Sequence, residues 1–168
     1  MRYLFDANVF IEAKNRYYAF DICPGFWDWM DSVCTSAADV GSIRSVRDEL
    51  IAGNDELAEW AKNRQDAPWF LKVDDEDTQR AFATIAANVT ADVYSAPAQS
   101  KFLAGADPWL IAKAKVVGAT VVTHELPEPM AKKRVPIPNV CGKFGVPFIN
   151  TFDTLRQFAT TFGWRPTS

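Results

Sequence analysis

Two short runs that are apolar throughout constrain the fold of this chain most. They lie in the strands predicted over 2–6 and 119–123, and neither alternates between apolar and polar residues. A strand with one face in water alternates, whereas a strand covered on both faces is apolar throughout. The runs therefore predict strands inside a parallel sheet. Weaker strand candidates lie at 39–43, 70–73 and 146–149, and a proline in the last is typical of an edge strand.

Helical patterns lie between these strands. The clearest begins at Asp107, where a capping carboxylate precedes Pro108, and it ends at Gly118. Further helices are predicted after the second strand and over 54–64, 75–89 and 151–162. This alternation predicts a three-layer α/β/α sandwich with a central, mostly parallel sheet, and the length of 168 residues predicts a single domain over 1–168.

The composition excludes several classes of protein. With 48% hydrophobic and 23% charged residues, the chain is neither disordered, collagen-like nor a coiled coil. Its apolar runs fall well short of the roughly 18 residues that span a bilayer, and its 3 cysteines form no CxxC pair. We expect a cytoplasmic protein with reduced thiols.

Two segments fit the alternation poorly. Residues 14–35 are an aromatic-rich insertion, and 126–139 are a proline-broken loop that carries a cluster of basic residues. Long loops in compact domains are often functional.

Several acidic residues stand where elements begin or end. Asp6 ends the first strand, Glu125 follows the strand at 119–123, and Glu49 lies in a short helix after the second strand. Because ligands collect at the carboxyl ends of parallel strands, these three acids are placed to reach one edge. Asp107 begins a helix that precedes a strand, and simple winding predicts that it lies at the opposite edge unless the connection is irregular.

The chemistry of these acids depends on whether they meet. Alone, Glu49, Asp107 and Glu125 also fit ordinary roles as a surface charge, a helix cap and a loop charge, whereas Asp6, bracketed by apolar segments, needs a partner. Clustered carboxylates repel, and a divalent cation relieves the repulsion. With one histidine, His124, and no thiolate pair, the oxygen donors suit Mg²⁺ or Mn²⁺. The implied reaction is phosphodiester hydrolysis by a water molecule that the metal activates.

The order of four short motifs resembles the PIN-domain nucleases. The motifs are Leu4-Phe5-Asp6-Ala7-Asn8, Val46-Arg47-Asp48-Glu49, Ala106-Asp107-Pro108 through Ala112, and Val122-Thr123-His124-Glu125. The resemblance implies a PIN-like fold in which Asp6, Glu49, Asp107 and Glu125 converge as catalytic, metal-binding acids. It also implies supporting roles for Asn8 and Thr123. Glu125 stands where the family usually has Asp.

The stretch 7–18 is similar to a bacterial subgroup of unknown function, related to toxin components of toxin–antitoxin pairs. The resemblance thus implies an Mg²⁺- or Mn²⁺-dependent endoribonuclease, the toxin of a type II pair. Its expected partners are an RNA substrate, a cognate antitoxin protein and a second copy in a homodimer, without a membrane.

The net charge of −3 does not exclude RNA, because setting aside four acids at a metal site leaves 18 bases against 17 acids. The cations expected to contact RNA, unless they form only a solvated surface, are Lys14, Arg16, Lys132, Lys133 and Arg134, with Tyr17 or Tyr18 available to stack on bases.

Two other functions compete with this interpretation. Asp6 and Thr123 partly imitate motifs of the haloacid-dehalogenase-like phosphatases. However, Asn8 replaces the second acid of their first motif. That family also has an acidic pair downstream of the threonine, whereas Asp74-Asp75 lies upstream of it here. The altered region around Glu125 also fits a non-catalytic module that binds RNA or protein.

Overall fold

The computed structural model describes residues 2–35 and 39–163. Its centre is a parallel sheet of 5 strands in the order β3-β2-β1-β4-β5. Tyr3 pairs with Val40 on one side and with Thr120 on the other. The predicted parallel sheet is therefore confirmed, and the strand that follows Pro147 lies at an edge. The strands are β1 (Tyr3–Phe5), β2 (Val40–Ile43), β3 (Phe70–Leu71), β4 (Thr120–Val122) and β5 (Phe148–Ile149).

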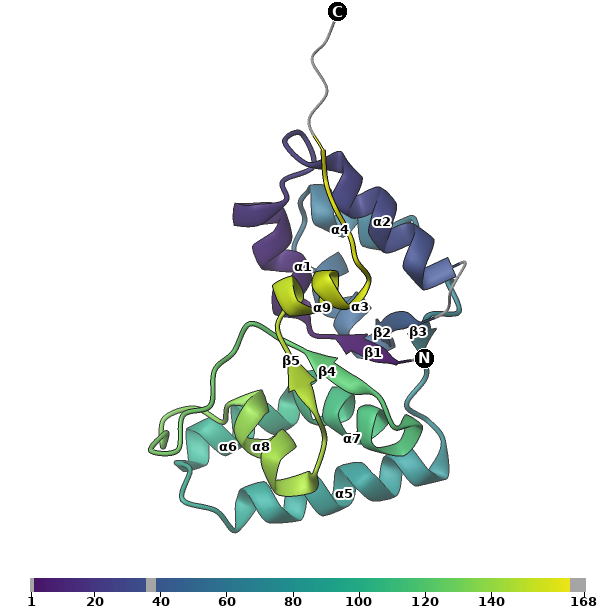
Figure 1. Ribbon diagram of the computed structural model, residues 1–168. Coiled ribbons are helices and arrows are strands. Elements are labelled where there is room, and N and C mark those ends of the chain that lie inside the picture. The colour runs from purple at the N-terminus through teal and green to yellow at the C-terminus, as the bar shows by residue number, and fades with distance from the viewer. Residues whose placement is uncertain (1, 36–38, 164–168) are drawn as a thin grey trace, which may run out of the picture.

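Helices cover both faces of the sheet, as the sequence predicts. Figure 1 shows α1 to α4 and α9 on one face and α5 to α8 on the other. The helices of the first layer are α1 (Ala7–Glu12), α2 (Pro24–Thr35), α3 (Arg44–Ile51), α4 (Glu56–Lys62) and α9 (Thr151–Gln157), and the π-helical turn η1 (Ala13–Tyr17) continues α1. Those of the second layer are α5 (Glu76–Thr90), α6 (Ala96–Ala104), α7 (Asp107–Val117) and α8 (Ile137–Phe144).

The core lies on both sides of β1, the central strand. Leu4 and Phe5 are fully buried, and the Ser42 hydroxyl donates a hydrogen bond of 2.6 Å to the Phe5 carbonyl oxygen. In the second layer, the rings of Phe82 and Trp109 stack at 3.7 Å and join α5 to α7. A strand covered in this way has no solvated face, which explains why its sequence is apolar throughout.

The order of the strands places a cleft beside β1. The chain proceeds outward from β1 to β2 and β3, and then returns to place β4 and β5 on the opposite side. In open parallel sheets, loops on the two sides of such a reversal diverge at the carboxyl ends of the strands and leave a crevice. The segments that follow β1 and β4 therefore border this crevice.

Residues 14–35 are not an irregular insertion. They form η1 and α2, where Phe26, Trp27, Met30, Val33 and Cys34 are buried on one helical face. The ring of Tyr18 stacks on Phe26 at 4.4 Å. The aromatic richness reflects core packing, since these rings fill the layer over the sheet.

Three other expectations about elements need correction. The helix predicted over 151–162 ends at Gln157, and Ala159 has φ 50°, which no α-helix continues through. The loop predicted over 126–139 already contains the start of α8 at Ile137. Helices α1 and α6 were not predicted. Helix α7 buries Leu110, Ile111 and Ala114, whereas Val117 is exposed.

Cys23, Cys34 and Cys141 are free thiols, as expected. None of the helices in the described ranges combines the length and the apolar character that a bilayer crossing requires.

Candidate active site

Asp6 is a buried carboxylate fixed at the end of β1. Its backbone N–H donates to the Val122 carbonyl oxygen at 3.0 Å, which ties it to β4. The Thr123 hydroxyl donates to Asp6 Oδ2 at 3.0 Å, and the side chain is 1% exposed. Thr123 therefore holds the Asp6 carboxylate in place, and its supporting role in catalysis stays a prediction.

Burial raises the pKa of Asp6, the hydrogen bond from Thr123 lowers it and the charge of Glu125 raises it, so that the pKa lies at about 6. The apolar surroundings that conceal Asp6 thus penalise its charged form.

Asp107 lies at the same edge of the sheet as Asp6, and the expectation from simple winding was wrong. A helix between two parallel strands runs antiparallel to them, so it begins at the edge where strands end. Asp107 is also not the cap of α7: Ala106 holds the N-cap position, and no side-chain capping bond forms there. The carboxylate is instead free to face the crevice.

Glu49 supports the turn that leads into Asp107. It lies on α3, and its Oε1 accepts a hydrogen bond of 2.9 Å from the backbone N–H of Ala106. This bond joins the first helical layer to the start of α7 in the second. Glu49 is thereby connected to the residue that precedes Asp107.

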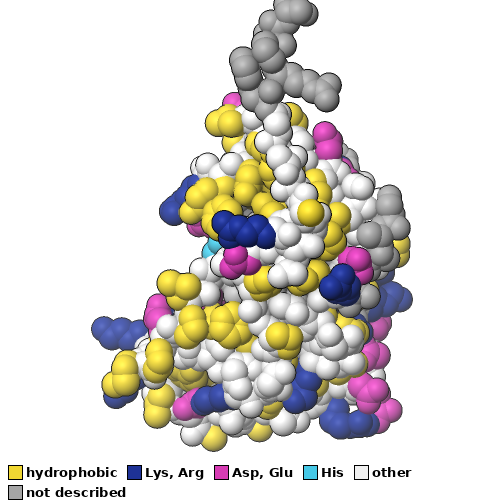
Figure 2. All heavy atoms as spheres, viewed as in Figure 1, with side chains coloured by type: hydrophobic (Ala, Val, Ile, Leu, Met, Phe, Trp, Pro, Cys, Tyr) yellow, Lys and Arg dark blue, Asp and Glu magenta, His cyan; other side chains and the backbone are white. Residues whose placement is uncertain are grey.

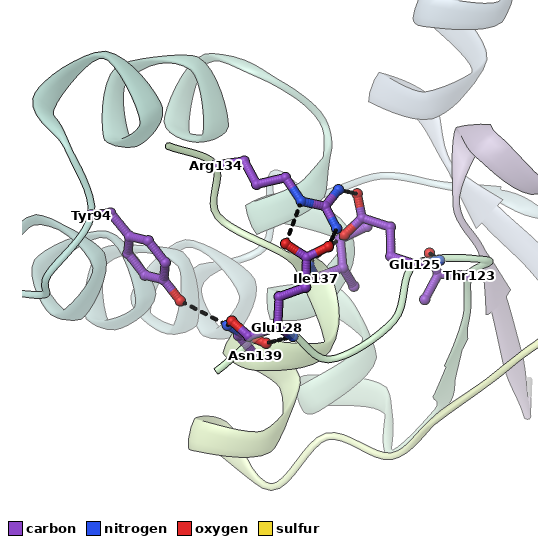
Figure 3. Close-up of polar contacts among 7 residues, drawn as sticks. All are labelled: Tyr94, Thr123, Glu125, Glu128, Arg134, Ile137 and Asn139. Atoms are coloured by element: carbon purple, nitrogen blue, oxygen red, sulfur yellow. Dashed lines mark hydrogen bonds and ion pairs between the residues drawn. The ribbon is translucent and has the colours of Figure 1, made fainter. Parts of the chain in front are cut away.

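Glu125 is anchored in the opposite direction, toward α8. Its Oε2 accepts a hydrogen bond of 2.7 Å from the Ile137 backbone N–H, and its Oε1 lies 3.6 Å from Nη1 of Arg134 (Figure 3). Its own backbone N–H donates to the Thr123 hydroxyl oxygen at 3.2 Å. One hydroxyl therefore links Asp6 to the segment that carries Glu125.

All four acids line one cavity of about 370 Å³. Asn8 also lines it, while the side-chain hydrogen bond to Asp6 comes from Thr123. Burial, together with the charges of Asp6, Glu125 and Glu49, raises the pKa of Asp107 to about 8. The carboxylates are thus close enough to repel one another. A larger hollow of about 670 Å³ beside α4 has no such set, and there Arg64 is paired with Asp31.

The cations at this cavity differ partly from those predicted. Lys133 and Arg134 line it, together with Lys101 of α6, which the sequence analysis did not single out. Lys14 is instead bound to Asp55 at 2.8 Å, Arg16 is paired with Glu12, and Lys132 is not among the lining residues. The signal that was available for Lys101 is the Ser95-Ala96-Pro97 helix start that places it on α6.

The two tyrosines that were named for base stacking lie in different surroundings. The ring of Tyr18 packs on Phe26, whereas Tyr17 is 47% exposed and lies 5.9 Å from the His124 ring. The Thr151 hydroxyl lies 2.9 Å from His124 Nε2, and burial lowers the pKa of this imidazole. Figure 2 shows a notch in the surface between the two helical layers, with basic and acidic side chains beside it.

The donor set of the cavity fits a hard divalent cation. Its charged ligand groups are all carboxylates, and a cation offsets the repulsion that raises the pKa of Asp107. Across residues 2–35 and 39–163, no three acidic, histidine or cysteine side chains are already grouped to hold one ion. The case for a cation thus depends on charge and donor chemistry.

The fold is similar to that of two solved complexes. FitAcB from Neisseria gonorrhoeae matches with a TM-score of 0.53 and 19% identity, over 89% of this chain and 98% of that one. VapBC2 from Rickettsia felis, bound to a DNA fragment from its promoter, matches with a TM-score of 0.53 and 13% identity over the same shares. These similarities confirm the PIN-like fold.

A comparison with curated proteins finds no match. The family described as domain of unknown function DUF4411 matches residues 3–162. Because this match covers nearly all of the chain, the protein belongs to that family.

Proposed function

We propose that this protein is an Mg²⁺- or Mn²⁺-dependent endoribonuclease. One observation carries the proposal: Asp6, Glu49, Asp107 and Glu125, drawn from four separate segments, line one cavity at the carboxyl ends of the strands. Lys101, Lys133 and Arg134 line the same cavity and supply positive charge for a phosphate. The similarity of the fold to FitAcB and VapBC2, and of the motifs to PIN-domain nucleases, supports this assignment.

In this proposal Asp6, Glu49 and Asp107 hold the cation. When bound, the cation supplies a polarised water and offsets charge that develops on the phosphate. Thr123 keeps Asp6 in place, and Glu49 keeps the start of α7 in place. Lys101 and Lys133 bind the RNA backbone beside the acids, so the phosphodiester is drawn to the carboxylates rather than repelled by them.

The test is cleavage of a labelled single-stranded RNA by the purified protein in EDTA, Mg²⁺ and Mn²⁺. Cleavage should require the metal and should be lost in Asp6→Asn and Asp107→Asn while circular dichroism shows an intact fold. Asp77→Asn, on the exposed surface of α5, is the matched control for loss of a carboxylate.

Full activity in both site variants would contradict the proposal. A protein that binds RNA but neither binds Mn²⁺ nor cleaves would favour the non-catalytic module. An aspartyl-phosphate trapped on Asp6 would favour the phosphatase.

We further propose that the protein is the toxin of a type II toxin–antitoxin pair. The resemblance of residues 7–18 to toxin-like proteins supports this, as does the similarity to VapBC2, a complex bound to promoter DNA. Induced expression should arrest bacterial growth, Asp107→Asn should not, and co-expression of the protein encoded by the adjacent gene should relieve the arrest. The proposed homodimer is tested by sedimentation of the purified protein.

A further inference from the structure

The segment 126–136 is fastened to the cavity through Glu125. Both carboxylate oxygens of Glu125 have a partner. One accepts a hydrogen bond of 2.7 Å from the Ile137 backbone N–H, and the other forms an ion pair with Arg134 Nη1 at 3.6 Å. Glu49 differs, because only its Oε1 accepts a hydrogen bond within the part of the chain that the structure describes. Glu125 therefore joins the two ends of the segment, whereas the second carboxylate oxygen of Glu49 stays available to the cavity.

A second carboxylate fixes the same guanidinium. Glu128 accepts two hydrogen bonds from Arg134, from Nε at 3.1 Å and from Nη2 at 2.6 Å. Asn139 of α8 fixes the Glu128 backbone, because its Oδ1 accepts from the Glu128 N–H at 2.9 Å and its Nδ2 donates to the Glu128 carbonyl at 2.7 Å. Figure 3 shows the guanidinium between the two glutamates.

This fixed guanidinium retains donors that the glutamates do not use. Arg134 carries five N–H donors, and in the described ranges its Nη1 makes no hydrogen bond within the protein. The side chain is 48% exposed and lines the cavity. A planar cation that is already ordered loses little conformational entropy when it binds an oxyanion.

Two neighbouring lysines add to the positive charge of Arg134 at the cavity wall. Lys101 and Lys133 line the cavity, and neither forms an ion pair with any described residue. Beside the ordered Arg134, these two lysines add positive charge to the cavity wall that no ion pair with a described residue offsets, and this charge favours an anionic ligand.

We propose that Glu125 is a positioning residue, which holds Arg134 at the cavity wall so that Arg134, with Lys101 and Lys133, binds an RNA phosphate. The cation is then left to Asp6, Glu49 and Asp107. This assignment rests on the proposed nuclease function and departs from the expectation that Glu125 is a metal ligand.

The experiment compares Glu125→Gln, Arg134→Met and the double variant with the parent. Asp107→Asn serves as the reference for loss of a metal ligand, and Arg156→Met, on the exposed face of α9, controls for loss of an arginine. Mn²⁺ affinity is measured by electron paramagnetic resonance of the free ion. Affinity for a fluorescent single-stranded RNA 12-mer is measured in EDTA.

Glu125→Gln should keep Mn²⁺ affinity within about threefold of the parent, whereas Asp107→Asn should lose about tenfold or more. Glu125→Gln and Arg134→Met should each weaken RNA binding about tenfold, because a charge-assisted contact is lost or misplaced. The double variant should bind RNA no more weakly than Arg134→Met, since both act through one group.

Hydrogen exchange gives a readout that does not depend on metal or RNA. Glu125→Ala should speed exchange of the Ile137 amide, whereas Glu125→Gln, which keeps an acceptor oxygen, should preserve much of its protection. The inference is overturned if Glu125→Gln loses as much Mn²⁺ affinity as Asp107→Asn, if Arg134→Met binds RNA like the parent, or if Glu125→Ala leaves exchange unchanged. A parent that binds no Mn²⁺ overturns the nuclease proposal instead, while RNA binding and exchange still decide the role of Glu125.

Discussion

A carboxylate that is buried beside other carboxylates lowers the stability of the metal-free protein at neutral pH. Asp107 shows this, since burial and the charges of Asp6, Glu125 and Glu49 all raise its pKa. We expect Asp107→Asn to remove this repulsion and stabilise the metal-free protein by ~1–3 kcal/mol at neutral pH. RNA cleavage should fall by ~100-fold or more, because a ligand matters more than the outer contacts that support it.

Urea denaturation in EDTA and single-turnover cleavage in Mn²⁺ measure the two effects. A variant that is both less stable and fully active would show that Asp107 has a structural role only.

Thr123 acts on the site through Asp6. Its hydroxyl donates to Asp6 Oδ2 and accepts from the Glu125 N–H, and the side chain is 2% exposed. Thr123→Val keeps the shape and removes both bonds, so we expect a loss of ~1–3 kcal/mol in unfolding free energy and of ~10-fold in Mn²⁺ affinity. Thr123→Ser should restore the Mn²⁺ affinity, as measured by calorimetry, and failure of serine to do so would exclude the hydroxyl as the cause.

At the scale of elements, two glycines, one just after α7 and one inside α8, form a matched pair. Gly118 follows α7 with φ 67°, whereas Gly142 lies inside α8, and an added Cβ meets no atom within 4 Å at either position. Gly118→Ala should destabilise the protein by ~1 kcal/mol, because an L-residue is strained at positive φ. Gly142→Ala should stabilise it by ~0.5–1 kcal/mol through helix propensity.

Thermal unfolding measures both effects. Equal shifts in the two variants would contradict the argument from backbone conformation.

How far the sequence predicts these elements depends on how strong their local signals are. The strand at β1 and the limits of α7 were predicted because an unbroken apolar run and a Pro108-to-Gly118 frame are local features. Helix α6 was missed because only Ala98 and Phe102 of its nine residues are buried, which is too few for a clear stripe. Lys101 was missed with it.

The site was predictable to a similar degree. Asp6 was identified from its apolar neighbours, which are local. The position of Asp107 depends on the direction in which α7 runs along the sheet, and the contacts of Glu125 depend on how 126–136 returns to α8. These relations arise only when distant segments pack, so a single sequence leaves them open.

At the scale of the whole molecule, we expect the acids to couple stability to pH and, at the proposed site, to metal. The raised pKa values mean that the folded state holds protons more tightly than the unfolded state, in which an aspartate has its usual value of 3.8. The stability from these groups is full below about pH 4 and is lost as pH rises through about 6 for Asp6 and about 8 for Asp107. We expect the metal-free protein to lose ~2–4 kcal/mol between pH 5.5 and 8.5.

Mn²⁺ should reverse this trend, because a cation that binds only the folded state stabilises it most where the carboxylates are ionised. Urea titrations at pH 5.5, 7.0 and 8.5, with EDTA or with Mn²⁺, measure the coupling. The profile of Asp107→Asn in EDTA should be flatter than that of the parent. Parallel profiles for the two proteins, or stabilisation by Mn²⁺ that does not grow with pH, would mean that the carboxylates of the cavity do not share the charge on which the proposed metal site depends.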